Sequence, residues 1–228
     1  MRNVIIIFKK QLKDTLKNKT VLIQFLLFPV MTLIMENTIR IDGMPELFFT
    51  KMFAFMYIGM APLTATAAII SEEKEKNTLR VLTMANVRPR QYLLGIGAYV
   101  WLICMTGAGL MATGFHGMEI AVFLTVMGIG FTLSILAGAC IGIYAKNQMV
   151  ANSVFIPVMM VLSFAPMVAL FNERIGKAAR YLYTQQLRTV LDRMSFAGMK
   201  TEGICILSAN ALIVTLLFFA LFKRKGLE

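Results

Sequence analysis

Uncharged stretches alternate with short charged connectors along the whole chain. Six stretches contain no Asp, Glu, Lys or Arg, and they cover residues 20–35, 52–71, 91–115, 120–145, 148–171 and 203–222. A helix needs about 20 apolar residues to cross the hydrocarbon core of a bilayer. The first stretch has only 16 residues, but the ammonium of Lys19 can extend to the interface and lengthen it. The pattern predicts an all-α membrane protein with six transmembrane helices, a single domain over residues 1–228.

Residues 1–19 predict a helix that lies flat in the membrane interface. One helical stripe is apolar and consists of Ile5, Phe8, Leu12 and Leu16. The lysines that project away from this stripe are Lys10, Lys13 and Lys17. In such an interfacial helix the lysines face anionic headgroups. A solvated basic tail is the alternative, and the apolar spacing favours the interfacial helix.

Residues 172–202 predict an extracellular helical segment before the last span. Its apolar residues recur at helical spacing and are Tyr183, Leu187, Val190, Leu191 and Met194. Its helical part also carries Arg180, Arg188 and Arg193. The segment either lies on the outer surface or dips back into the membrane. The arginines suggest contact with anionic lipid or with an acidic part of a cargo, a hypothesis that fails if their neutralisation changes neither export nor membrane binding.

Composition excludes a soluble globular protein and sets the expected orientation. The chain is 58% hydrophobic and 15% charged, with a mean hydropathy of +0.71 and a net charge of +11. In a soluble protein this charge would suggest a nucleic-acid partner, but here the basic residues cluster beside the spans. Most of the 23 basic residues fall on the side that holds both termini. The positive-inside rule therefore predicts a multi-pass protein of the cell (plasma) membrane with both termini in the cytoplasm, although the basic residues of 172–202 weaken this assignment.

Small residues, prolines and cysteines indicate how the spans pack. Gly130, Ser134, Gly138 and Gly142 follow one another at i+4 and predict a groove where another backbone approaches closely, within the subunit or between subunits. Prolines inside the predicted spans are Pro29, Pro62, Pro157 and Pro166, and the carbonyls they leave unpaired need donors from neighbouring helices. The cysteines are Cys104, Cys140 and Cys205. Their spacing predicts buried packing thiols and neither a disulfide nor a metal site.

The connector at residues 72–90 carries the main functional signal. Glu72, Glu73 and Glu75 crowd its start, where carboxylates favour a helix N-terminus, and Glu72 can pair with Lys76 at i+4. Leu79 and Leu82 then form a small apolar knob at i, i+3. A short helix with charged flanks and exposed leucines suits docking into a groove on a soluble partner. An ordinary charged turn is the alternative.

This connector resembles that of the permeases of type-2 ATP-binding-cassette (ABC) exporters, which commonly reads E-R-E-x-G-T-L-E-x-L-L, a proline-containing segment and then I-L-L-G-K. The residues that match the first part are Glu73, Glu75, Thr78, Leu79 and Leu82, and those that match the last part are Leu93, Leu94 and Gly95. The flat N-terminal helix, six spans and helical outer segment also look like this family. Asn77 stands where the family usually has Gly, Arg88-Pro89-Arg90 replaces the usual proline segment, and Ile96 replaces a frequent Lys.

The resemblance implies a permease that works with a separate ATPase subunit. The chain has no G-x-x-x-x-G-K-[ST] phosphate loop, so it is not expected to be an enzyme or to hold a cofactor, and ATP and Mg²⁺ belong to the partner. Two permeases, identical or paralogous, would pair in the bilayer, and each connector would seat on one ATPase. The expected coupling residues are Glu72, Glu73, Glu75, Thr78, Leu79 and Leu82. Glu73→Lys with Leu79→Asp is expected to leave the protein inserted but uncoupled from ATPase stimulation.

The cargo and three other classes of protein remain open at this point. Spans without charge suit export of a hydrophobic or amphipathic substrate such as a drug, a lipid-like molecule or a membrane-active peptide, and the single Trp101 gives little support for polysaccharide. An ion-coupled transporter usually needs ionisable groups inside the bilayer. A membrane-embedded enzyme would have to use His116 and Glu119, without an H-E-x-x-H or G-x-S-x-G motif. A non-transporting structural subunit is the third alternative.

Overall fold

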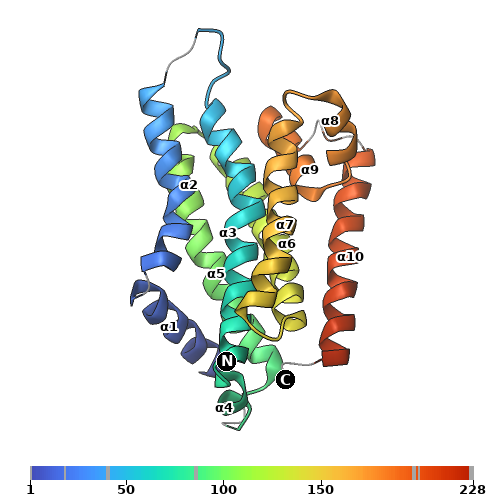
Figure 1. Cartoon of the computed structure of the whole chain (residues 1–228). Helices are drawn as coiled ribbons and strands as arrows, with labels where there is room; N and C mark the ends of the chain where they lie inside the picture. The colour runs from blue at the N-terminus through green and yellow to red at the C-terminus, as the bar shows by residue number, and fades with distance from the viewer. Residues whose placement is uncertain are drawn as a thin grey trace.

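A computed structural model of the chain describes residues 2–17, 19–39, 42–84, 87–196, 199 and 201–225. Its regular elements are all helices, as the sequence predicts. They are α1 (Arg2–Lys17), α2 (Lys19–Thr38), α3 (Phe48–Glu75), α4 (Thr78–Met84), α5 (Pro89–Met111), η1 (Ala112–Gly114), α6 (Met118–Tyr144), α7 (Gln148–Val168), α8 (Glu173–Ala179), α9 (Tyr183–Arg193) and α10 (Thr201–Lys225). Figure 1 shows the long helices side by side, with α1 and α4 at one end and α8 and α9 at the other. We call these the α4 end and the α9 end.

Five helices are long and apolar enough to cross a membrane: α3, α5 with η1, α6, α7 and α10. The predicted first span is a shorter apolar helix, Leu22–Thr38 within α2, which packs against α3 and α5. The structure does not describe the side chains of Leu16, Lys17 and Lys19, so the orientations predicted for them fall outside the described part of the chain. The start of α1 and the end of α10 both lie at the α4 end (Figure 1). This arrangement agrees with termini on the same side of the membrane.

The central helix α3 organises the bundle. It is buried along most of its length, whereas α10 packs mainly against α6 and α9 and exposes most of its surface. The four small residues of α6 face α3 in the same chain. A Cβ at Gly138 would overlap the carbonyl oxygen of Leu63, and one at Gly142 would lie 2.7 Å from Cβ of Ile70. Small residues at these positions therefore let the two backbones touch.

At two prolines in the bundle, a hydroxyl from another helix donates to the carbonyl that the proline leaves without its helical donor. Pro29 leaves the Phe25 carbonyl without its helical donor, and the hydroxyl of Tyr57 on α3 donates to it at 3.1 Å. Pro62 does the same to the Ile58 carbonyl, to which the Ser134 hydroxyl of α6 donates at 2.5 Å. The Ser134 oxygen lies 2.7 Å from the Tyr183 hydroxyl of α9. Helices α3, α6 and α9 thus meet at the Pro62 site of α3.

Ser134→Ala is expected to destabilise the protein by about 1 kcal/mol, because it removes the donor for a carbonyl in an apolar interior. The cost should shrink in a Pro62→Ala background, where residue 62 regains an N–H that can bond to Ile58. Unfolding of the purified protein in detergent micelles measures both. Ser153→Ala is the matched control, because this exposed hydroxyl bonds only to the Met149 carbonyl of its own helix. Equal costs for both serines would contradict the role of Ser134.

The cysteine prediction holds for two residues and is wrong for the third. Cys104 and Cys140 are buried, whereas Cys205 is exposed. The difference follows from position, because Cys205 lies on α10, whose outward surface packs against no other helix of the bundle. Among the described residues, no group of three or more His, Cys, Asp or Glu side chains is placed to hold a metal ion.

Candidate coupling site at the junction of α3 and α4

The three glutamates of the connector lie in the last turn of α3, and not at a helix N-terminus as the sequence suggested. The helix continues beyond the predicted span to Glu75. It ends where Asn77 adopts the left-handed conformation, with φ of +57°. Asn tolerates this conformation better than other residues with a side chain, so it can replace the glycine usual in the family at this position. The chain then turns directly into α4.

The carboxylates at this end point in three directions. Glu72 pairs with Lys76 at 2.5 Å on the exposed side, as predicted, and this hydrogen bond raises the pKa of Lys76. Glu75 accepts a 2.9 Å hydrogen bond from the backbone N–H of Gln148 and so caps the start of α7. On the same turn, Lys74 donates to the Ile143 carbonyl near the end of α6. The end of α3 is therefore tied to both α6 and α7.

Glu73 turns inward and holds α1. Its Oε1 lies 2.5 Å from Nζ of Lys10 and 2.7 Å from Nε2 of Gln11, and its side chain is only 9% exposed. The Tyr92 hydroxyl of α5 lies next to the same carboxylate. Oε2 has no hydrogen-bond partner among the described residues. A carboxylate this buried needs a nearby cation, which Lys10 supplies.

The sequence suggested that Lys10 faces the lipid headgroups, but in the structure Lys10 points toward Glu73. The side of α1 that faces the bundle consists of Ile7, Gln11 and Thr15, and all three are buried. Gly95 of α5 allows this contact, because a Cβ there would lie 2.8 Å from Cγ2 of Ile7. Ile5 and Leu12 remain exposed on the other side. That apolar surface is available to the membrane interface.

The exposed face of α4 differs from the predicted one. Leu79 is buried at 4% exposure and Leu82 is half-buried, so the leucines attach α4 to the bundle. Among the side chains of α4 that the structure describes, those that project outward are Val81 and Met84, at 63% and 76% exposure. They lie three positions apart and share a helix face. Thr78 opens the helix and is half-buried. The i, i+3 spacing of Val81 and Met84, on the side opposite the leucines, is the sequence pattern that could have indicated this surface.

These positions change what the double substitution of Glu73 and Leu79 would measure. Both side chains are buried. A lysine at 73 would face Lys10, and an aspartate at 79 would be buried among apolar groups. Loss of coupling in that variant would therefore report damage to the junction and not loss of a docking contact. A test of docking has to change Val81 and Met84.

The segment before α10 enters the bundle at the α9 end. The apolar residues predicted for its helix face inward: Tyr183, Leu187, Val190 and Leu191 are buried, and Met194 is half-buried. Helix α9 packs against α3, α6, α7 and α10. Residues 197, 198 and 200 of the predicted segment lie outside the described part of the chain.

The three arginines of this segment have different surroundings. Arg180 pairs with Glu202 of α10. Arg188 points into the bundle, where it donates to the Pro166 carbonyl at 2.9 Å and lies 5.8 Å from the centroid of the Phe55 ring. It therefore caps the end of α7 instead of facing lipid or cargo as predicted. Arg193 is exposed and lines a cavity between α9 and α10.

Comparison with known proteins gives the family. A scan against protein-family models matches residues 2–222 to the family described as ABC-2 family transporter protein. A search of curated proteins found no match. Members of this family are membrane permeases that work with ATPase subunits and are not themselves catalytic. The match confirms the resemblance carried by the connector, and the chain belongs to the ABC-2 transporter family as its membrane permease component.

Proposed function

We propose that this permease exports a hydrophobic or amphipathic substrate, and that α4 couples it to a separate cytoplasmic ATPase. The observation that carries the proposal is the exposed pair Val81 and Met84, on a short helix at the tip of the central helix α3. An apolar helix face of this kind fits a groove on a soluble partner. The α4 end, with the start of α1 and the end of α10, then faces the cytoplasm, which is the orientation that the positive-inside rule favours.

The helix α3 is suited to transmit a movement of α4 across the bilayer. Its 28 residues give a rod about 42 Å long. At the α4 end it is tied to α1 by Glu73, to α6 by Lys74 and to α7 by Glu75. Near its middle it is joined to α9 through Ser134 and Tyr183. A displacement that begins at the ATPase therefore reaches the helices at both ends of the bundle. For ATP to drive transport, it must bind the two conformations of the complex with different affinities.

Two permeases, identical or paralogous, pair in this proposal, and α2 completes six spans in each. Large apolar side chains are exposed on α2 and α7, among them Ile23, Ile34, Ile156, Met160 and Phe164. Such faces are suited to contact lipid or the second permease. The uncharged spans suit a drug, a lipid-like molecule or a membrane-active peptide as cargo, with ATP and Mg²⁺ bound by the ATPase.

Transport in proteoliposomes tests the function. The full chain is reconstituted with and without a candidate partner ATPase of the ABC class, and movement of a fluorescent amphipathic dye is followed after addition of ATP and Mg²⁺. Dye movement is expected only when both proteins and ATP are present, because the chain lacks a phosphate-binding loop. Movement by the permease alone, or by the pair without ATP, would contradict the proposal.

A further inference from the structure

The short helix α8 lies on the outside of the bundle at the α9 end. It packs mainly against α7, and all of its residues except Gly176 and Ala179 are exposed. Ala179 is buried, and a Cβ at Gly176 would lie 3.7 Å from the carbonyl oxygen of Ala169. One side of α8 therefore rests on the end of α7, and its exposed side chains are left to contact the surroundings of the protein.

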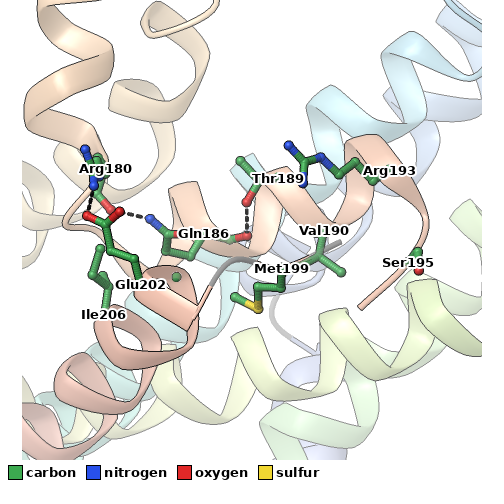
Figure 2. Close-up of a pocket in the computed structure, with 10 residues that line it drawn as sticks. Arg180, Gln186, Thr189, Val190, Arg193, Ser195, Met199, Glu202 and Ile206 are labelled. Atoms are coloured by element: carbon green, nitrogen blue, oxygen red, sulfur yellow. Dashed lines mark hydrogen bonds and ion pairs between the residues drawn. The ribbon is translucent and has the colours of Figure 1, made fainter. Parts of the chain in front are cut away.

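Two spans fix the depth of α8 in the bilayer. Helix α7 has 21 residues and is about 31 Å long, so its last residue, Val168, lies near one boundary of the hydrocarbon core. Only residues 169–172 separate Val168 from α8. The residue that follows α8, Arg180, pairs with Glu202 (Figure 2), and the uncharged part of α10 begins directly after Glu202. Both ends of α8 are therefore held near the same boundary, so the helix lies along the membrane surface.

The exposed side chains of α8 form an apolar set and a basic set. Ile175 and Ala178 are three positions apart and share a helix face, and the same spacing places Arg174 beside Lys177. Neither basic side chain forms an ion pair or hydrogen bond within the described part of the chain. Glu173 is the one acidic residue of α8. The helix therefore carries a net positive charge that its own contacts leave available.

Aromatic residues flank α8 on both sides. Phe171 precedes the helix and Tyr181 follows it, at 77% and 66% exposure. Exposed aromatic rings gather at the two interfaces of a membrane, where they contact acyl chains and polar groups together. A helix with an apolar and a basic face, flanked by such rings and held at the boundary of the hydrocarbon core, suits the headgroup layer.

We propose that α8 lies in the headgroup layer of the leaflet at the α9 end and binds anionic phospholipids there. Phe171 and Ile175 contact the acyl chains. The cations of Arg174 and Lys177 bind the phosphates through charge-assisted hydrogen bonds. The part of residues 172–202 that lies on the membrane surface is then α8, whereas α9 enters the bundle. This contact does not depend on α4 or on the proposed coupling to an ATPase.

Fluorescence of the full chain in lipid nanodiscs tests the position of α8. Trp101→Phe removes the single tryptophan of the chain, and Phe171→Trp then provides one fluorophore beside α8. This fluorophore is expected to lose most of its emission in phosphatidylcholine with brominated acyl chains. Pro45→Trp in the same background is the matched control, because Pro45 is exposed in the loop between α2 and α3, which projects beyond the helices at the same end (Figure 1). Quenching at residue 171 no stronger than at residue 45 would overturn the placement of α8.

Equimolar mixtures of phosphatidylglycerol and phosphatidylcholine, with bromine on one lipid or the other, test the lipid class. Phosphatidylglycerol should be enriched about fivefold around residue 171, the factor expected for one net positive charge near an anionic surface. Brominated phosphatidylglycerol should therefore quench more than brominated phosphatidylcholine, and Arg174→Gln with Lys177→Gln should abolish the difference. Lys9→Gln with Lys13→Gln should preserve it, because these exposed lysines lie on α1 at the other end. Equal quenching by the two lipids, or the same loss in both double variants, would overturn the binding of anionic lipid by α8.

Discussion

Replacing Val81 and Met84 together by aspartate is expected to abolish stimulation of the partner ATPase while the permease remains folded and inserted. Both side chains are exposed and point away from the bundle, so a charge there costs the isolated permease little. At an apolar contact the same charges would be desolvated. Loss of two central apolar contacts weakens an interface by about 2 kcal/mol or more, which corresponds to at least about a thirtyfold loss of affinity.

The measurement is ATPase activity and co-purification of the reconstituted complex, with wild type and variant at equal protein content. Met118→Asp is the matched control, because Met118 is 78% exposed and begins α6 at the opposite end of the bundle. It should leave ATPase stimulation unchanged. The docking role of α4 is wrong if the Val81/Met84 variant is stimulated like wild type, or if the control loses stimulation to the same extent.

Lys10→Met is expected to destabilise the protein by about 2–3 kcal/mol, because it leaves the Glu73 carboxylate buried without its cation. Glu73→Gln should lower the free energy of unfolding by less than Lys10→Met does. The Lys10 side chain is 36% exposed and can reach water after its partner is removed, whereas the Glu73 side chain cannot. The double variant Lys10→Met with Glu73→Leu should recover most of the loss, since an apolar pair can replace a buried ion pair.

Unfolding in detergent micelles gives these free energies, and Lys13→Met serves as control. Lys13 lies on the same helix but is exposed, so its replacement should change stability by no more than about 0.5 kcal/mol. If Glu73→Gln costs more than Lys10→Met, or if the double variant is less stable than either single one, the carboxylate is not held as the structure indicates.

The sequence predicted the helical membrane fold because long uncharged stretches allow few alternatives in a bilayer. It also predicted the apolar face of α9 and the pair of Glu72 with Lys76. These features depend on residues that are close in the chain, where helical spacing determines which side chains share a face.

What the sequence could not give are contacts between distant residues. Lys10 and Glu73 are 63 positions apart, and no local pattern relates them. Leu79 and Val81 are both apolar, and only the packing of α4 on α3 determines which of them is buried. Arg188 was expected to contact lipid or cargo, but it donates to the carbonyl of Pro166 on another helix. The end of α3 was misplaced because its carboxylates were assigned to the start of the following helix, whereas Glu73 binds α1 and Glu75 binds the first turn of α7.

The hydrogen bond at Pro62 of α3 bears on how the permease changes shape. The Ile58 carbonyl relies on a hydroxyl from α6, and in hydrocarbon no water is present to replace that donor. Sliding of α6 past α3 would break this hydrogen bond and leave the carbonyl unpaired in an apolar interior. We therefore expect α6 and α3 to move together, with their register unchanged, when the permease changes conformation.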